Sequence, residues 1–172
     1  DNASSDGTVE RLRERYPDLP EPVRLPSNHG FCVPHNAMIA QCGTRYYLAL
    51  NQDVELASDY VERLCDWMDA RPEVGLAMGL VLMPQAGRSA DDLARALRAW
   101  PPAAADPMPI VHSRGLVFPR VRRQFQLGMN RTPAPEDLRA RRLPGVDGAA
   151  MMLRVDACRA AGLPEGEVFP SE

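Results

Sequence analysis

A short polar turn, Asn51-Gln52-Asp53, directly follows an apolar run of the sequence, Tyr46 to Leu50. Ligands of open α/β sheets bind outside the carboxyl ends of strands, where a carboxylate just past a buried strand is held rigidly. Mg²⁺ and Mn²⁺ prefer one or two carboxylates and complete their shells with substrate phosphates and water. We therefore expect Asp53 to bind a divalent metal, with Asn51 beside it. The simpler alternative is that both residues only form a turn.

A second polar turn opens the sequence, residues 1–8 (DNASSDGT). A carboxylate can accept hydrogen bonds from the N–H edge of a pyrimidine or guanine base, and hydroxyl groups can bind ribose or phosphate. The alternative is that Ser5 or Asp6 caps a helix. Both interpretations are compatible with the residues alone.

His29, Cys32 and His35 could begin a zinc site, but a fourth ligand is missing nearby in the sequence. A glycine-containing loop beside a nucleotide is the favoured interpretation of this stretch. The chain has no GxGxxG fingerprint, no Walker A motif, no HExxH motif and no Gly-x-Ser-x-Gly nucleophile elbow.

Composition excludes several classes of function. The chain has 172 residues, 45% of them hydrophobic and 25% charged, which is ordinary for one globular domain. A net charge of −3 gives no electrostatic reason to expect nucleic acid as a partner. All 20 basic residues are Arg, and the lack of Lys excludes a P-loop lysine, a Schiff-base lysine and a lysine general base.

The four cysteines lack the paired spacing of zinc or redox motifs and indicate reduced thiols. No apolar run is long enough to be a transmembrane segment. We therefore expect a cytoplasmic protein, and a peripheral association with the inner face of the membrane is a further expectation.

Hydrophobic periodicity predicts helices that alternate with strands. The continuous apolar runs of the strands are typical of a parallel sheet buried on both faces, so the sequence predicts an α/β fold. Helices are predicted over Gly7–Tyr16, Asn36–Gln41, Ser58 to Pro72, Ser89 to Trp100 and Asp156–Ala161, and strands over Val23–Leu25, Arg45–Leu50, Val74–Met83 and Val146–Arg154.

The middle of the chain gives weaker signals. Pro101–Pro109 is rich in Pro and Ala and is predicted to be a loop. Arg114–Arg142 carries many arginines, and the favoured interpretation is a solvated, mobile loop. The functional alternative is an arginine-bearing flap over a phosphate or an anionic acceptor.

Taken in order, these segments resemble the rhamnosyltransferase-like inverting glycosyltransferases of family 2, which have the GT-A fold. The resemblance covers most of the chain and is weakest between Arg88 and Leu143. The matching segments are residues 1–8, Asn28-x-Gly30-Phe31 with Asn36, residues 50–53 (LNQD), and residues 146–149 (VDGA) with Leu153-Arg154.

The resemblance implies a Rossmann-like nucleotide-diphospho-sugar transferase fold and a hexosyltransferase-type enzyme. The reaction would move a sugar from a nucleoside-diphosphate donor to a hydroxyl of a glycan or lipid-linked acceptor, with inversion. Cell-surface polysaccharide synthesis is the context that it implies.

The resemblance also implies roles for individual residues. Asp1 would contact the base of the donor, and Asn51 and Asp53 would occupy the place of the family's Asp-x-Asp motif, with Asp53 as the ligand of Mg²⁺ or Mn²⁺. Close relatives usually have Asn-Pro-Asp there, so Gln52 is a departure. The donor pocket would be shaped by Asn28, Gly30, Phe31 and Asn36, and the surroundings of the acceptor and pyrophosphate by Asp147 and Gly148.

The two ends of the sequence depart from the family. Two strands normally precede the Asp-Asn turn, and the catalytic base belongs to a Glu-Asp motif shortly after the segment that corresponds to Phe169–Glu172. We therefore expect residues 1–172 to be an internal fragment of a GT-A domain, truncated at both ends, inactive by itself and with the base beyond Glu172. Its expected parts are a nucleotide-sugar and metal-binding part (1–83), an irregular arginine-rich segment (84–145) and an acceptor-side strand and helix (146–172).

Two other classes of function stay open. One is a non-catalytic nucleotide-sugar-binding or assembly module that lacks the base. The other is a different nucleotide-using α/β enzyme such as a nucleotidyltransferase, although such an enzyme would need a glycine-rich phosphate loop that this sequence does not offer.

Overall fold

The computed structural model of the chain describes residues 1–99, 108–120, 123–162 and 168–169. The chain divides into two compact units. The larger one is Tyr46–Arg154, and the smaller one combines Asp1–Arg45 with Val155–Glu172. The predictions for Trp100 and for most of the 101–109 loop concern residues outside the described ranges.

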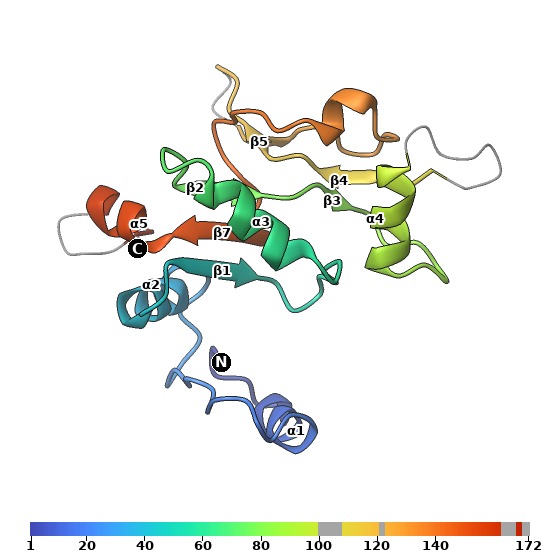
Figure 1. Cartoon of the computed structure of the whole chain (residues 1–172). Helices are drawn as coiled ribbons and strands as arrows, with labels where there is room; N and C mark the ends of the chain where they lie inside the picture. The colour runs from blue at the N-terminus through green and yellow to red at the C-terminus, as the bar shows by residue number, and fades with distance from the viewer. Residues whose placement is uncertain (100–107, 121–122, 163–167, 170–172) are drawn as a thin grey trace. The chain divides into compact units, whose positions relative to one another are not determined.

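The larger unit is built on a three-stranded sheet in the order β1-β7-β2 (Figure 1). β7 (Ala150–Arg154) pairs antiparallel with β1 (Tyr46–Leu50) on one side and with β2 (Leu76–Met78) on the other. The prediction of parallel neighbours is therefore wrong. β1 and β2 run in the same direction, but they do not pair with each other. β7, which comes later in the chain, lies between them and makes backbone hydrogen bonds with both.

Helix α3 (Tyr60–Asp69) supplies the core on one side of this sheet. Met68, Ala77 and Met152 form the buried cluster, against which the partly buried Leu64 and Cys65 of the predicted helix face pack. Val61, predicted for the same face, is 45% exposed, because it lies at the start of the helix, one turn before the residues that reach the core. The N-cap of the helix is Asp59, not Ser58.

The apolar run predicted as one strand, Val74–Met83, is divided into two short strands that belong to different sheets. β2 ends at Met78, and β3 (Val81–Leu82) pairs antiparallel with β4 (Val111–Ser113). The break falls at Gly79, whose N–H donates to the Tyr60 hydroxyl oxygen at 3.0 Å. A Cβ atom at this position would lie 2.6 Å from the Tyr60 ring, so the close approach requires glycine.

The hydroxyl group of Tyr60 also makes a second hydrogen bond, to β7. It donates to the carbonyl of Ala150 at 2.7 Å, at the start of β7. Burial raises the pKa of the Tyr60 phenol, which keeps this donor protonated. One partly buried side chain therefore joins the end of β2 to the beginning of β7.

Helix α4 (Ala90–Arg98) begins at Ser89, as predicted. The Ser89 side chain accepts the N–H of Asp92, and the Asp92 carboxylate accepts from the N–H and hydroxyl of Ser89, which completes a capping box. These hydrogen bonds lower the pKa of Asp92 to about 2. Leu93 is buried, in agreement with its place on the predicted apolar face.

The arginine-rich segment is not loop throughout, although most of its described residues are exposed or partly exposed. It contains the hairpin of β5 (Leu116–Val117) and β6 (Phe125–Gln126) and the 3₁₀ helix η1 (Pro135–Leu138). The flap over an anionic ligand stays a prediction.

A buried carboxylate joins separate parts of this segment. The side chain of Asp137 is 0% exposed and pairs with Arg114, which is 8% exposed, and with Arg131 at 2.6 Å. Asp137 also accepts the N–H of Ala134 at 2.7 Å. Burial alone would raise the pKa of Asp137, but hydrogen bonds from Arg131 and Ala134 and the charges of the two arginines outweigh it, and the pKa lies below its usual range.

The smaller unit contains α1 (Thr8–Arg15), α2 (Cys32–Gln41) and α5 (Val155–Ala161). The N-cap of α1 is Gly7 at φ +79°, although the Asp6 carboxylate accepts the N–H and hydroxyl of Thr8 at 3.1 and 2.6 Å. α2 begins four residues before the predicted Asn36, because Pro34 lies in the first turn, where no N–H partner is needed.

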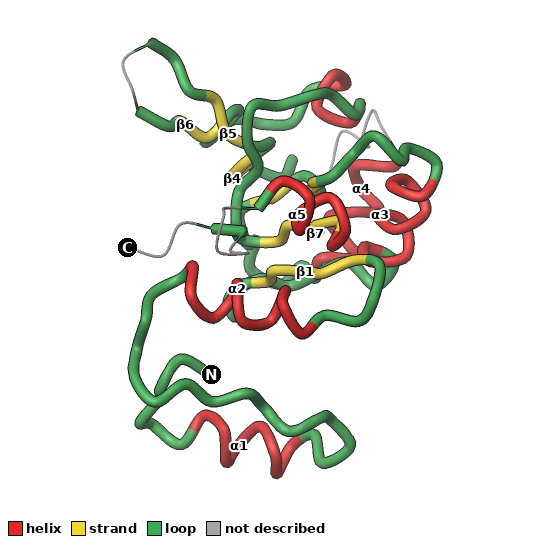
Figure 2. The backbone as a smooth tube through the Cα atoms, turned by 90° about the vertical axis from the view of Figure 1, so that its left-hand side faces the viewer, coloured by secondary structure: helices red, strands yellow, loops and turns green. Residues whose placement is uncertain are grey.

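The predicted strand Val23–Leu25 is not a regular strand, but it does make ladder-like hydrogen bonds. The amino group of Asp1 donates to the carbonyl of Val23 at 2.7 Å, and the N–H of Leu25 donates to the carbonyl of Asp1 at 2.9 Å. In Figure 2 the first residues accordingly run beside the segment that follows α1.

The close contact at Gly79 makes a first prediction. Gly79→Ala forces its new methyl group against the Tyr60 ring, so we expect the free energy of unfolding to fall by about 1–3 kcal/mol. Urea unfolding followed by far-UV circular dichroism measures this change. Gly43→Ala is the matched control, since no atom lies within 4 Å of a Cβ there and the backbone is not left-handed. Equal stability of the two variants would contradict the role of Gly79.

A second prediction concerns Asp137. Asp137→Asn keeps the shape but leaves Arg114 buried without its charge partner, and we expect a loss of about 3–5 kcal/mol at pH 7. Because the folded pKa of Asp137 lies below the unfolded one, its contribution is fully present above about pH 4 and disappears as pH falls through the folded pKa. The difference between wild type and variant in urea unfolding should therefore shrink below about pH 4. Asp18→Asn, an exposed carboxylate, should show no such difference.

Candidate functional site

Two of the segments predicted for the site meet at the end of β1. Leu50 lies opposite Ala150 in the antiparallel pair, so the turn after β1 lies beside the residues before β7. The N–H of Asn51 donates to the carbonyl of Ala149 at 2.9 Å, and the N–H of Val54 donates to the carbonyl of Asn51 at 3.2 Å. The sheet register therefore brings the Asn51–Asp53 turn to the Asp147–Ala149 segment.

Asp53 is exposed, and its carboxylate makes no hydrogen bond or ion pair with any residue that the structure describes. In that same part of the chain, no group of three or more His, Cys, Asp and Glu side chains could hold a metal ion. An ion enclosed by protein ligands is thus not supported, and neither is zinc at His29, Cys32 and His35. A single available carboxylate does fit a hard cation that is held largely by substrate phosphates.

The loop after Asp53 is held against the N-terminus of α4. Glu55 accepts the N–H of Ala90 at 2.9 Å. Asp91 accepts the N–H and hydroxyl of Ser58 at 2.8 and 3.0 Å, and these bonds lower the pKa of the Asp91 carboxyl. Both ends of the turn that carries Asp53 are therefore fixed, one by β1 and the other by α4.

Asp147 and Gly148 line a pocket of about 430 Å³ on the larger unit. Asp147 accepts from the side-chain amide of Gln126 at 2.8 Å and from the N–H of Ala149 at 3.1 Å. The same amide nitrogen lies 3.2 Å from Nε2 of His112. The residues that line the pocket are Leu116, Gln124, Phe125, Gln126, Met129, Asp147 and Gly148.

Sequence reasoning missed Gln126, Phe125 and His112. Gln126 and Asp147 are 21 residues apart, and they meet only because the β5–β6 hairpin folds back over the segment before β7. A short strand with an exposed Phe carries no local signal of a binding site, so nothing in the sequence alone could have identified it.

Asn2 was not among the predicted site residues, but its side chain makes hydrogen bonds to two of them, Asn28 and Gly30. The Asn2 amide donates to the side chain of Asn28 at 3.0 Å and to the carbonyl of Gly30 at 2.9 Å. Its oxygen accepts the N–H of His29 at 2.9 Å. Gly30 has φ +69°, a left-handed conformation that glycine adopts without strain. The signal available in the sequence was its position directly after Asp1.

The Asp1 carboxylate is 8% exposed. It accepts the N–H of Ser4 at 3.2 Å and lies 3.7 Å from the Arg24 guanidinium. These contacts fix the carboxylate, and its contact with a nucleotide base stays a prediction.

Asn36 holds the chain near Phe169. Its amide donates to the carbonyl of Phe169 at 2.7 Å and accepts the N–H groups of Val168 and Phe169 at 3.1 and 2.9 Å. The Phe31 ring is 45% exposed, and its centroid lies 4.2 Å from that of His35. Burial lowers the pKa of His35, which favours the neutral imidazole. Asn36 and Phe31 thus belong to one packed cluster, and their role toward a donor stays a prediction.

The predicted site residues fall into two sets. Those of the smaller unit are Asp1, Asn28, Gly30, Phe31 and Asn36, and those of the larger unit are Asn51, Asp53, Asp147 and Gly148.

The described part of the chain combines helices and strands, which is consistent with an α/β protein. The family model described as Glycosyl transferase family 2 matches residues 1–160, and the chain belongs to this family. Membership implies the GT-A fold, glycosyl transfer, a nucleotide-sugar donor and a glycan acceptor. No curated protein and no solved structure matched the chain. Within the described residues, no helix is both long enough and apolar enough to cross a membrane.

The role of Asn2 makes a third prediction. Asn2→Ala removes the acceptor of the His29 N–H, so we expect amide hydrogen exchange at His29 to accelerate by about five- to tenfold. Exchange followed by NMR or mass spectrometry gives the rates. Ser5→Ala, a substitution of an exposed residue in the same turn, is the control. Unchanged protection of the His29 amide in Asn2→Ala would contradict the role of Asn2.

Proposed function

We propose that the chain binds a nucleoside-diphosphate sugar through Asp53 and a divalent metal, as a rhamnosyltransferase-like, inverting glycosyltransferase of the hexosyltransferase type. The acceptor is a hydroxyl of a glycan or lipid-linked glycan, in cell-surface polysaccharide synthesis. The observation that carries the proposal is the available carboxylate of Asp53, fixed at the end of β1 beside the segment that leads into β7.

The surroundings of Asp53 support this role. The backbone of Asn51 is tied to Ala149, so the carboxylate is presented from a turn whose position is set by the sheet. A bound Mg²⁺ or Mn²⁺ supplies positive charge to the leaving diphosphate. Asn51 has an exposed side chain next to the turn and offers an amide to the donor sugar.

Considered by itself, the smaller unit presents groups that suit a nucleotide base. Asp1 presents a carboxylate that Ser4 and Arg24 orient, and Asn2 holds the Asn28–Gly30 turn in place. The half-exposed ring of Phe31 follows directly on this turn and offers a face for stacking. These residues supply recognition and take no part in proton transfer.

The reaction is a single in-line displacement in which a carboxylate removes the proton of the acceptor hydroxyl. We assign this general base, worth roughly 10²–10⁴ in rate, to none of the described residues. Its location beyond Glu172 stays a prediction, as do the cytoplasmic location and the peripheral association with the membrane.

The test is isothermal titration calorimetry with Mn²⁺ and the diphosphates of uridine, thymidine, guanosine, cytidine and adenosine. We expect metal-dependent binding of one or two of them, and a loss of at least about tenfold in affinity in Asp53→Asn, because one charge-assisted contact disappears. Asp66→Asn is the matched control, as an exposed carboxylate on α3 without a side-chain partner among the described residues.

Two outcomes would contradict the proposal. One is equal affinity in Asp53→Asn and wild type. The other is the absence of binding of all five nucleotides by a chain whose circular dichroism shows that it is folded.

A further inference from the structure

The pocket at the β5–β6 hairpin has the size of a small-molecule site. Its volume of about 430 Å³ lies within the range of roughly 300–1,000 Å³ that such sites span. All of its described lining belongs to the larger unit, from the hairpin and from the Asp147-Gly148 turn.

The polar side chains of this pocket are two glutamines and one carboxylate, and the hydrogen bonds of Gln126 leave acceptor atoms available. The Gln126 amide nitrogen donates to Asp147 at 2.8 Å and lies 3.2 Å from Nε2 of His112, which must accept because an amide nitrogen only donates. These two partners use both amide hydrogens and so fix the orientation of the amide. The Gln126 Oε1 atom has no partner among the described residues, and each Asp147 oxygen keeps a second lone pair.

The charge of the pocket distinguishes between possible ligands. Its described lining contains one carboxylate and no arginine. A phosphate group placed there would meet the negative charge of Asp147 without a compensating cation. A neutral ligand that donates hydroxyl hydrogens is the chemical complement of this surface.

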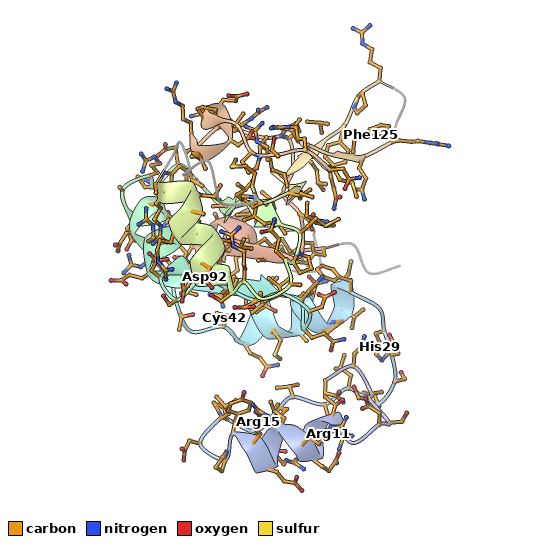
Figure 3. The ribbon with its side chains drawn as sticks, turned by 90° about the vertical axis from the view of Figure 1, so that its right-hand side faces the viewer. Arg11, Arg15, His29, Cys42, Asp92 and Phe125 are labelled. Carbon is orange, nitrogen blue, oxygen red and sulfur yellow. The ribbon has the colours of Figure 1, made fainter. Side chains whose placement is uncertain are left out.

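The remaining walls are apolar and accessible. Phe125 is 50% exposed and Met129 is 46% exposed, and Figure 3 shows Phe125 on the hairpin. Leu116 of the neighbouring strand is partly buried below them. An aromatic face next to acceptor groups matches a ring that has C–H groups on its face and hydroxyl groups on its edge.

We propose that this pocket is a subsite for one neutral pyranose ring of the acceptor glycan. The ring stacks on Phe125, and its hydroxyl groups donate to Gln126 Oε1 and to Asp147. His112 acts as a positioning residue, since it holds the Gln126 amide with its oxygen available. This inference rests on the proposed function, because it concerns the acceptor of the same reaction.

The test uses methyl pyranosides of glucose, galactose, mannose and rhamnose without any donor. Saturation-transfer difference NMR on the full chain detects binding, and a titration gives Kd. We expect at least one pyranoside to bind, and Phe125→Ala to weaken its binding by about tenfold through loss of the stacking face. Gln126→Leu, which removes the free acceptor, should weaken it as well.

Phe118→Ala is the matched control. Phe118 is 56% exposed and follows β5 in the same hairpin, but it does not line the pocket, so its replacement should leave Kd unchanged. The proposal is overturned if no pyranoside binds the folded chain, or if Phe118→Ala and Phe125→Ala weaken binding equally. It is also overturned if inorganic diphosphate displaces the pyranoside.

Calorimetry with Mn²⁺ and nucleoside diphosphates on the same sample separates this inference from the proposed function. Nucleotide binding without pyranoside binding would refute the subsite alone. Pyranoside binding without nucleotide binding would refute the donor site and leave the subsite supported.

Discussion

The insertion of β7 between β1 and β2 is the constraint on which the larger unit depends. The first four residues of this strand are each at most 4% exposed, so both of its faces are covered by protein. Met152 takes part in the core with Met68 and Ala77, while the register of Leu50 against Ala150 decides which turns lie side by side. A change of register by one residue would exchange the two faces of β7 and separate Asn51 from Ala149. The same hydrogen bonds therefore hold the core and build the proposed donor site.

Tyr60 connects the sheet of the larger unit to the segment that carries the pocket residue Asp147. Its hydroxyl group connects Gly79, where the first sheet ends, to Ala150, where β7 begins. Asp147 lies three residues before Ala150 and carries the hydrogen bonds of the pocket. A partly buried phenol that is not among the described lining residues thus holds the start of the strand that follows Asp147.

The sequence predicted those features that depend on neighbouring residues. The N-cap at Ser89, the apolar face of α3 at Leu64 and Met68, and the polar turn after β1 are all local signals. Strand pairing was not predictable in this way, because β7 is distant in the sequence from both strands that it joins. The short elements of the arginine-rich segment were not predicted for the same reason.

The ion pairs within that segment were not predictable from the sequence either. The many arginines resemble a solvated surface until the single carboxylate of Asp137 is seen to pair with Arg114 and Arg131. For the candidate site, the sequence identified polar residues that are neighbours within one turn, such as Asn51 and Asp53. It did not identify Gln126 and His112, because their contacts join residues that are distant in the sequence.

The division of the larger unit into separate sheets has a consequence for how this chain can change in evolution. Phe125 and Gln126 belong to a small sheet of their own, and neither belongs to the cluster around Met152 that holds β1, β2 and α3 together. Substitutions in the hairpin can therefore alter one wall of the pocket without disturbing the packed strands. The opposite wall, at Asp147, lies three residues before β7 and is constrained together with the fold.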